Sequence, residues 1–478
     1  MALEYMNFYN KTLFLDQFTP VSIYQKVKEV FSDEITFLFE SVVNSDDGNF
    51  SYIFIGDRER VWHKDSTSYY KNEEGTIQQI DKNPFVFLKE YYKNINKKFY
   101  HDKGKELGIG LIDGFIGNMG YDMVATFEPT LHKSMDGLKD EFGIVDCDLI
   151  RPKMVLVYSH KTSQLSLITS MESMSKYIEI IEKKLQESFE YTPLKKVELL
   201  DEGSFSHTKE EFFDMIAKSK EMIRSGDVFQ ILMTNRYTRR AKVDTLSFYR
   251  ALRSKNPSPY LFLLEYEDFT IAGSSPEVMV RLTDDRILLR PIAGTRKRGK
   301  TVSKDNEMEQ EMLNDPKEVA EHVMLIDLGR NDVGRVAKVG TVQVTDKMRV
   351  ERYSHVMHMV SDVEATIDEK YDMFDLFAAT FTAGTMTGAP KIRAMELIAQ
   401  FEKLKRSFYS GSIAYFGFDG NMDSAITIRT TMIKDDTVVF QAGAGVVADS
   451  VPELEFLEVN NKLAANITTL EDLSKIES

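Results

Sequence analysis

Short extended runs joined by polar turns restrict the fold of this chain more than any other feature. In the second half, residues 228–240, 260–266, 269–272, 278–282 and 287–290 are apolar or alternate between apolar and polar positions. Short polar turns join several of these runs, which favours an antiparallel sheet over regular β-α-β units. Amphipathic runs at 208–225 and 316–328 predict helices beside the sheet. The sequence therefore predicts an α+β fold.

Charge and cysteine content exclude several classes of protein. The formal net charge is −15, and the Lys and Arg residues are scattered rather than massed, which argues against nucleic acid or an anionic membrane surface as a partner. Cys147 is the single cysteine, so an internal disulfide and a CxxC site are excluded. No signal peptide and no apolar run of 18 residues is found, and we therefore expect a cytoplasmic protein without a membrane span.

A polar stretch at residues 191–206 is the best candidate for a boundary, because it lacks a clear hydrophobic period. It divides the 478 residues into an N-terminal half, 1–204, and a C-terminal half, 205–478. In the N-terminal half, Thr19 and Pro20 predict the start of a helix with apolar side chains three to four residues apart.

Residues 441–462 combine features of an anion site. Gly443 and Gly445 follow an apolar run, which predicts a strand that ends in a turn whose backbone N–H groups can approach an anion. Ser450 is the expected N-cap of the next helix, with Pro452 in its first turn. This stretch alone predicts an anion-binding turn that leads into a helix.

Carboxylates are placed where they can hold a cation. Glu455, Glu458 and Lys462 fall on one face of the helix expected after Pro452, and Glu321 lies in the first half of another predicted helix. A solvated face with one ion pair is the simpler interpretation of this spacing. If the two helices face each other, the oxygen ligands suit Mg²⁺ better than zinc.

Two histidines, His355 and His358, have HxxH spacing. As a zinc site this is weak, because no third His or Cys stands at ligand spacing. His358 can instead act as an acid or as a hydrogen-bond donor to a substrate.

Further anion contacts are expected from two turns and one arginine. A cation-rich turn at 290–299 and a loop at 381–393 that feeds a helix beginning near Pro390 can present backbone N–H groups and hydroxyls. Tyr415 and Arg429 lie on adjacent predicted strands, and a buried Arg429 needs an anionic partner. Together these features predict an enzyme that acts on a small polyanion.

Five segments, in order along the chain, resemble the motifs of the chorismate-utilising enzymes. They are residues 291–299, 321–332, 353–358, 383–391 and 441–447. The resemblance covers essentially the whole chain. It implies that two large, mainly antiparallel sheets pack together with helices outside, and that the halves 1–204 and 205–478 interleave.

The resemblance also implies a set of site residues, carried over position by position. Glu321 and Glu458 would hold Mg²⁺, which bridges to the ring carboxylate of chorismate. His358, Thr385, Gln230 and Lys462 are the implied catalytic residues. The implied substrate-binding residues are Gly294, Thr295, Tyr415, Arg429, Gly443, Ala444 and Gly445.

Within the family, the chain resembles the anthranilate-forming branch, which uses ammonia. Water-using branches carry Lys where this chain has Gln230, and Gln cannot deprotonate water, whereas ammonia needs no such base. Ala293 stands where aminodeoxychorismate-forming enzymes often carry a nucleophilic Lys, but that branch remains the alternative. Because Cys147 has no nucleophile context, glutamine-dependent activity would require a separate glutamine amidotransferase subunit.

Feedback inhibition is implied by the N-terminal half. Residues 38–41, Leu-Phe-Glu-Ser, resemble the inhibitory motif of the anthranilate-forming branch, with Phe39 as a departure from it. The resemblance predicts an L-tryptophan site formed by Glu40, Ser41, Pro259, Tyr260 and Leu261.

Overall fold

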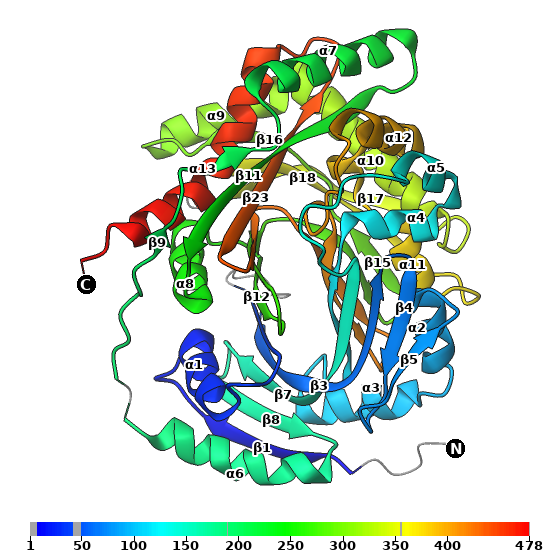
Figure 1. Ribbon diagram of the computed structural model, residues 1–478. Coiled ribbons are helices and arrows are strands. Elements are labelled where there is room, and N and C mark those ends of the chain that lie inside the picture. Colours follow the sequence, from blue (N-terminus) through cyan, green and yellow to red (C-terminus); the bar gives the residue numbers. More distant parts are fainter. Residues whose placement is uncertain (1–6, 42–48, 189, 354–355, 478) are drawn as a thin grey trace.

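The chain folds into a system of antiparallel strands flanked by helices, as the computed structural model of residues 7–41, 49–188, 190–353 and 356–477 shows (Figure 1). The strands are β1 (Tyr9–Phe14), β2 (Thr36–Glu40), β3 (Phe50–Lys64), β4 (Thr67–Lys71), β5 (Ile77–Ile80), β6 (Gly114–Met119), β7 (Cys147–Ser159), β8 (Gln164–Thr169), β9 (Glu198–Leu199), β10 (Ser204–Phe205), β11 (Gln230–Lys242), β12 (Tyr260–Glu265), β13 (Thr270–Ser275), β14 (Val278–Thr283), β15 (Arg286–Leu289), β16 (Ile292–Lys297), β17 (Gln343–Arg352), β18 (Val356–Thr366), β19 (Gly388–Ala389), β20 (Ser412–Gly417), β21 (Met422–Ile426), β22 (Thr430–Lys434) and β23 (Thr437–Val446).

Helices cover the outside of this sheet system. They are α1 (Pro20–Val30), α2 (Pro84–Tyr92), α3 (Lys97–Leu107), α4 (Val124–Phe127), α5 (His132–Met135), α6 (Glu172–Gln186), α7 (Lys209–Ser225), α8 (Thr245–Lys255), α9 (Val302–Asn314), α10 (Pro316–Gly334), α11 (Met373–Thr380), α12 (Lys391–Glu402) and α13 (Pro452–Ser474), with short 3₁₀ turns at Tyr121–Met123, Pro129–Leu131 and Gly384–Met386. Thr19 caps α1 and Thr208 caps α7, each through a capping box. The helix starts predicted at these two residues are confirmed.

Strand pairing joins the two halves of the chain. β2 pairs with β3 on one side and with β12 on the other, and β6 lies between β7 and β20. These pairings are antiparallel and link the strands into one hydrogen-bonded system. The predicted antiparallel α+β fold is confirmed.

Helix α13 packs along β23, next to α7 and α8. Val459, Leu463, Leu470 and Leu473 are its buried apolar residues, and their spacing places them on one face of the helix. Because this face is fixed against the sheet, Glu458 is carried at a defined position beside β23. The hydrophobic contact thus orients a polar side chain that a solvated helix would leave free.

Two local predictions for residues 441–462 are wrong. Gly443 and Gly445 lie inside β23 rather than in a turn, opposite Thr234 and Leu232 of β11. Beyond Phe440 the other edge of β23 has no strand partner in the described residues. Ser450 does not cap α13; its hydroxyl accepts the backbone N–H of Val447 and closes the preceding turn. The glycines therefore bring a strand edge, not a turn, to the site.

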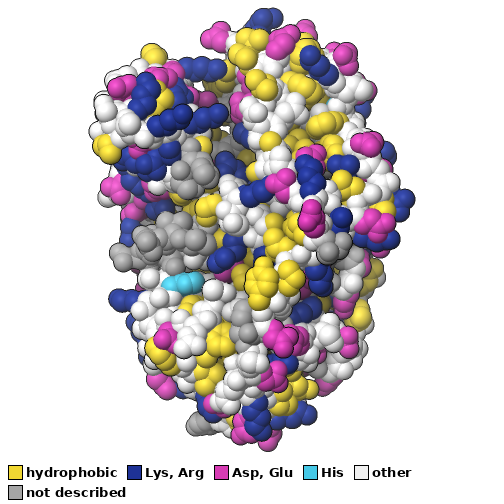
Figure 2. Space-filling view, turned by 90° about the vertical axis from the view of Figure 1, so that its left-hand side faces the viewer, with side chains coloured by type: hydrophobic (Ala, Val, Ile, Leu, Met, Phe, Trp, Pro, Cys, Tyr) yellow, Lys and Arg dark blue, Asp and Glu magenta, His cyan; other side chains and the backbone are white. Residues whose placement is uncertain are grey.

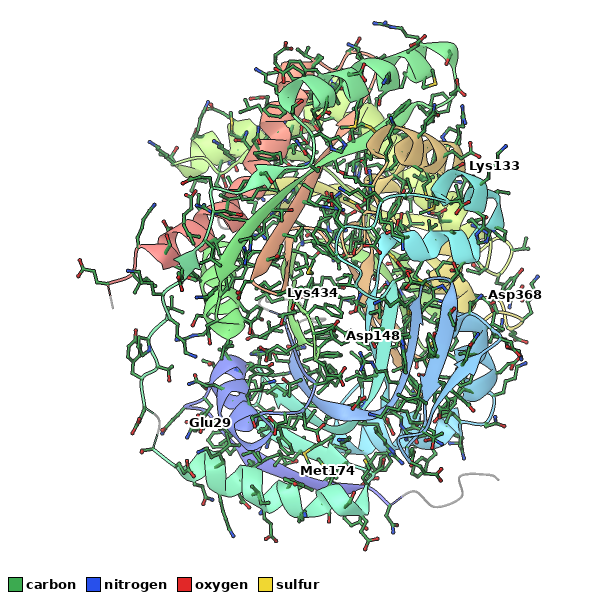
Figure 3. The ribbon with its side chains drawn as sticks, viewed as in Figure 1. Glu29, Lys133, Asp148, Met174, Asp368 and Lys434 are labelled. Atoms are coloured by element: carbon green, nitrogen blue, oxygen red, sulfur yellow. The ribbon has the colours of Figure 1, made fainter. Side chains whose placement is uncertain are left out.

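Charged side chains lie both inside the molecule and over its surface. Asp148 is fully buried and pairs with Arg60 at 2.7 Å, and Figure 3 shows Asp148 among the strands while Lys133 and Asp368 stand at the periphery. Figure 2 shows acidic and basic side chains interspersed over one face of the molecule. Across the described segments, no helix has both the length and the apolar character needed to span a membrane.

Candidate functional site

The candidate site lies where β11 and β23 meet α10 and α13. Gln230, at the start of β11, is 5% exposed, and its Nε2 donates to Oε1 of Glu321 on α10 at 3.4 Å. A Cβ at Gly445 would stand 2.5 Å from Nε2 of Gln230, so the glycine gives this side chain its space. Oε1 of Gln230 is buried and has no hydrogen-bond partner among the described residues. A buried acceptor of this kind indicates a place for a donor from a ligand.

Acidic side chains of α10 and α13 converge beside Gln230. Burial raises the pKa of Glu321, and the negative charges of Glu318 and Glu458 raise it further. Burial likewise raises the pKa of Glu455. The Glu458 side chain is 47% exposed and pairs with Lys462 at 2.7 Å. The charge of Glu458 on α13 therefore reaches Glu321 on α10, as the cation-site interpretation requires.

The donor set of this cluster fits a hard divalent cation such as Mg²⁺. Glu321 and Glu458 offer carboxylate oxygens, and the cost of placing them together is visible in the raised pKa of Glu321. In the parts of the chain that are described, no three His, Cys, Asp or Glu side chains form a complete metal cage. Mg²⁺ commonly uses one or two carboxylates together with substrate oxygens and water, so two ligands suit it.

Lys462 is held by the protein on two sides. Besides its ion pair with Glu458, its Nζ donates to the carbonyl oxygen of Gly443 at 2.8 Å. The side chain thus ties α13 to the free edge of β23. It lies at the predicted site and fixes the strand edge that Gly443, Ala444 and Gly445 form.

His358 is part of a row of side chains across β16, β18 and β17. It lies opposite Thr295 on one side and Glu351 on the other, and its Nδ1 is 3.0 Å from the Thr295 hydroxyl and 3.3 Å from the Gly294 carbonyl oxygen. Gly294 has φ +64, a conformation that glycine adopts without strain. The predicted partner His355 lies outside the described residues.

The imidazole of His358 is neutral at physiological pH. It is 6% exposed, and burial together with the positive charge of Arg429 lowers its pKa to about 4. Since a carbonyl oxygen can only accept, the bond to Gly294 places the proton on Nδ1 and leaves Nε2 as an acceptor. The ring can therefore take a proton from a substrate.

Glu277 belongs to the same site and was not predicted. It follows β13, is 8% exposed, and accepts a hydrogen bond from the Thr385 hydroxyl at 2.8 Å. Burial raises its pKa to about 7, even though the bond from Thr385 and the charges of Lys462 and Arg429 favour the ionised form. Glu277 can thus carry a proton at neutral pH. Sequence patterns give no sign of this burial, because Ser275, Pro276 and Glu277 read as an ordinary connection between strands.

Arg429 presents a guanidinium that has no hydrogen-bond or ion-pair partner among the described residues. Burial lowers its pKa, with Glu277 and Tyr353 near enough to oppose that shift. The residue follows β21 with φ +50, and its side chain forms no hydrogen bond or ion pair with any residue that the structure describes. A partly buried arginine of this kind needs an anion, so the predicted role in ligand binding is consistent with its surroundings.

Tyr415 does not join the other predicted substrate contacts. It lies on β20 and faces a separate cavity, with its ring 6.5 Å from that of Tyr52. The tyrosine beside β23 is Tyr409, whose hydroxyl is hydrogen-bonded by the backbone of Gly443. The structure therefore separates Tyr415 from the other predicted substrate contacts, whereas Tyr409, six residues earlier in a turn that hydrophobic periodicity does not reveal, lies beside them.

Paired Tyr-to-Phe substitutions separate the two positions. Tyr409→Phe is expected to raise the KM for the substrate by roughly 5- to 10-fold, the effect of losing one hydrogen bond worth ~1 kcal/mol. Tyr415→Phe should leave that KM unchanged, because the hydroxyl belongs to the other cavity. Steady-state kinetics of both variants decide the matter, and a larger KM effect at Tyr415 would reverse this assignment.

The separate cavity brings together all the residues predicted to bind an inhibitor. It has a volume of about 350 Å³ and is lined by Glu40, Ser41, Pro259, Tyr260 and Leu261. Further lining residues are aromatic or charged: Phe39, Phe50, Tyr52, Tyr415, Arg281, Arg290, Glu351 and Tyr353. Phe39, the departure noted in the sequence, packs edge-on against Phe54 at 5.3 Å and contributes to the apolar wall.

Glu40 is the most unusual group in this cavity. It is 4% exposed; one carboxylate oxygen accepts from Tyr249 at 2.6 Å and pairs with Arg253 at 3.0 Å. Its other oxygen, Oε1, is buried and has no hydrogen-bond partner in the described segments. The cavity therefore offers an acceptor for an ammonium group next to aromatic rings and guanidinium groups.

Comparison with known proteins gives a consistent picture. The chorismate binding enzyme family matches residues 42–468. Among curated relatives, anthranilate synthase component 1 of Aquifex aeolicus is 41% identical over 96% of this chain and 93% of its own, and that of Neisseria gonorrhoeae is 40% identical over 95% and 92%.

Solved structures agree with the sequence relatives. Anthranilate synthase component I from Streptococcus pneumoniae superposes with a TM-score of 0.77 at 31% identity, covering 89% of this chain and 94% of its own. An isochorismate synthase from Escherichia coli shares the fold, with a TM-score of 0.70 at 16% identity. The family match, the relatives that cover nearly the whole chain and the geometry of the site together show that this chain belongs to the chorismate-binding enzymes.

Proposed function

We propose that this enzyme converts chorismate and ammonia to anthranilate and pyruvate. The proposal depends on the environment of Gln230. Its buried Oε1 has no hydrogen-bond partner in the described residues and can accept a hydrogen bond from ammonia. Glutamine also provides no base for activating water at that position. The relatives named above, each an anthranilate synthase component 1, support the same product.

In the first step ammonia adds at C2 of the ring while the hydroxyl leaves C4. Gln230 holds ammonia by its carbonyl oxygen, and Arg429 with the free edge of β23 binds a substrate carboxylate. Glu277, protonated below about pH 7 and held by Thr385, supplies the proton with which the hydroxyl departs as water. The ammonium formed at C2 gives up its surplus proton to solvent, and Glu277 takes up a proton again before the next turnover. The first step thus needs one protonated carboxyl and one unprotonated nucleophile.

In the second step the enolpyruvyl group leaves C3 and the ring becomes aromatic. A proton is removed from C2 as the C3–O bond breaks, and the enolate that departs becomes pyruvate by taking up a proton at its methylene carbon. Nε2 of His358 is an unprotonated acceptor suited to that removal, and its bonds through Nδ1 to Gly294 and Thr295 fix the ring. Both steps therefore use the uncharged forms of Glu277 and His358, which burial favours.

Glu321 and Glu458 would hold Mg²⁺ beside the substrate. When bound, the cation neutralises the ring carboxylate and polarises the ring.

We expect Glu321→Gln to raise the Mg²⁺ concentration for half-maximal activity at least 10-fold, because one of two protein ligands is lost. Titration of activity with MgCl₂ measures this, and Glu318→Gln is the matched control, since it changes the neighbouring charge on the same helix. Equal effects of the two variants would contradict the assignment.

The product distinguishes this proposal from its nearest rival. Purified protein incubated with chorismate, Mg²⁺ and an ammonium salt should produce anthranilate fluorescence and one equivalent of pyruvate. Accumulation of a non-fluorescent aminated compound without pyruvate would instead indicate an aminodeoxychorismate-forming enzyme. Ala293 provides no nucleophile next to Gly294, which favours the anthranilate-forming reaction.

We further propose that the cavity around Glu40 binds L-tryptophan as a feedback inhibitor, and that a glutamine amidotransferase subunit supplies ammonia. The aromatic lining suits an indole ring, the free oxygen of Glu40 suits the ammonium group, and the arginines of the cavity suit the carboxylate. Cys147 is fully buried, and burial raises the pKa of its thiol, so it is unsuited to release ammonia from glutamine.

Calorimetric titration with tryptophan tests the inhibitor site. We expect tryptophan to bind the wild type and not Glu40→Gln, and an absence of binding to the wild type would refute the site.

A further inference from the structure

The turn end of the β17–β18 hairpin touches both the proposed inhibitor cavity and His358. Glu351 and Tyr353 line the cavity. Glu351 is also the direct cross-strand neighbour of His358, and the Tyr353 ring packs against the imidazole with ring centroids 5.7 Å apart and an interplanar angle of 61°. Paired side chains on one face of an antiparallel sheet contact each other, so a shift of one changes the position of the other. The two sites thus share a wall.

Within this wall, Glu351 and Tyr353 are fixed to each other. The Tyr353 hydroxyl donates to Oε2 of Glu351 at 2.8 Å, while Oε1 of Glu351 accepts from Arg349 at 2.7 Å. The Tyr353 ring therefore lies against His358 in an orientation that the Glu351 carboxylate determines. A change in the hydrogen-bond partners of the Glu351 carboxylate therefore changes the position of the Tyr353 ring.

Arg290 gives a cavity ligand access to this pair. It lines the cavity, lies 4.0 Å from Glu351, and pairs with Asp362 at 2.7 Å. Asp362 also pairs with Arg349 at 3.1 Å, so two arginines and two carboxylates share their charges. A ligand carboxylate in the cavity competes with Asp362 for Arg290, since both are anions.

We infer that Glu351 and Tyr353 are positioning residues that couple occupancy of the cavity to the placement of His358. A ligand that draws Arg290 away from Asp362 leaves Asp362 to draw Arg349 away from Glu351. The Tyr353 hydroxyl then follows the Glu351 carboxylate, and the ring no longer holds the imidazole where elimination requires it. This inference rests on the proposed inhibitor site. Coupling between two sites is reciprocal and typically amounts to roughly 5- to 150-fold in affinity.

Pro276 forms a second connection between the two sites, because it lines the cavity and precedes Glu277. However, Glu277 is held by Thr385 from the opposite side, and proline has no backbone N–H through which to transmit a hydrogen bond. The hairpin is the better route between the two sites, because its side chains can exchange hydrogen-bond and ion-pair partners.

The test measures coupling within each variant, so that changes in basal activity cancel. The coupling factor is the ratio of the chorismate KM, or of 1/kcat, at saturating tryptophan to its value without tryptophan. For Tyr353→Phe and Glu351→Gln this factor is expected to fall at least 5-fold below that of the wild type. Calorimetry must show that tryptophan still saturates each variant, and melting temperatures monitor the fold.

Tyr260→Phe is the matched control. Tyr260 lines the same cavity, but its hydroxyl donates to Asp423 at 3.0 Å and accepts from Arg281 at 3.0 Å rather than bonding to Glu351 or Tyr353. This variant should bind tryptophan more weakly yet retain the full coupling factor at saturation. A purely structural role for Tyr353 would change basal activity or melting temperature and leave the factor intact.

Two results would overturn the inference, and they are distinguishable. A wild-type coupling factor in tryptophan-saturated Tyr353→Phe and Glu351→Gln would refute the role of the hairpin while leaving the inhibitor site in place. Absence of any tryptophan binding or inhibition in the wild-type protein would refute the inhibitor site, and this inference with it.

Discussion

Replacing Glu277 with Gln should abolish most of the activity and, at the same time, stabilise the protein at alkaline pH. Glutamine retains the shape and an acceptor for the Thr385 hydroxyl but cannot supply a proton. General acid catalysis contributes roughly 10²- to 10⁴-fold to rate, so kcat is expected to fall by that range. The pH profile of kcat/KM at constant free ammonia should fall above about pH 7 in the wild type, as Glu277 ionises.

The stabilisation follows from the raised pKa. A carboxyl whose pKa rises from 4.5 to about 7 on folding favours the folded state when protonated, and this advantage is lost as the pH rises from 4.5 to 7. At pH 8 the ionised wild-type side chain costs about 3 kcal/mol, which the uncharged Gln avoids. Below pH 4.5 the two proteins should have similar free energies of unfolding.

Chemical denaturation of both proteins at pH 4 and pH 8 measures this difference. Glu402→Gln is the matched control, because Glu402 is equally buried but pairs with Arg406 at 2.7 Å. Breaking that buried pair should destabilise the protein by ~3–5 kcal/mol. If Glu277→Gln retained wild-type turnover, Glu277 would not be the acid; if it were destabilised at pH 8, the carboxyl would be ionised and well solvated.

Arg429→Gln is expected to remove substrate binding while leaving the fold intact. In the described residues the guanidinium has no hydrogen-bond or ion-pair partner, and under the proposed function a substrate carboxylate is the anion that compensates its burial. Losing one partner of such a desolvated charge pair costs ~2–5 kcal/mol, equivalent to roughly 30- to several-thousand-fold in kcat/KM.

Thermal melts separate binding from folding in this case. Chorismate should raise the melting temperature of the wild type by mass action and fail to do so for Arg429→Gln. Arg429→Lys keeps the charge without the planar fork, and an intermediate loss is expected. A melting temperature of the unliganded variant well below that of the wild type would show that Arg429 supports the fold, contrary to this account.

The sequence predicted the fold class and most of the site, but not the parts that depend on tertiary burial. Alternating strands, a proline at a helix start and amphipathic periodicity are local signals, and they identified the antiparallel sheet and the starts of α1 and α7. Motif resemblance pointed to Glu321, Glu458 and Gln230; Gln230 donates to Glu321, and the charge of Glu458 raises the pKa of Glu321. Glu277 was missed because its chemistry arises from desolvation by segments distant in sequence, which no local pattern encodes.

Residues close in sequence can point to different parts of the molecule, and this explains the error at Tyr415. Tyr409 lies in a turn and reaches Gly443, whereas Tyr415 lies on β20, which points it toward Tyr52. The prediction that Gly443 and Gly445 form a turn failed for a related reason. Glycines at a ligand-facing strand edge and glycines in a turn have the same composition, and only the pairing with β11 tells them apart.

The position of β2 has a consequence for how the chain folds during synthesis. Residues 36–40 pair with β12, more than 200 residues later, and β6 must likewise wait for β20. A ribosome-bound chain that ends before residue 260 therefore exposes open strand edges that can recruit other chains. Because long-range pairing makes folding slow, we expect the emerging N-terminal segment to depend on chaperones until the second half is complete.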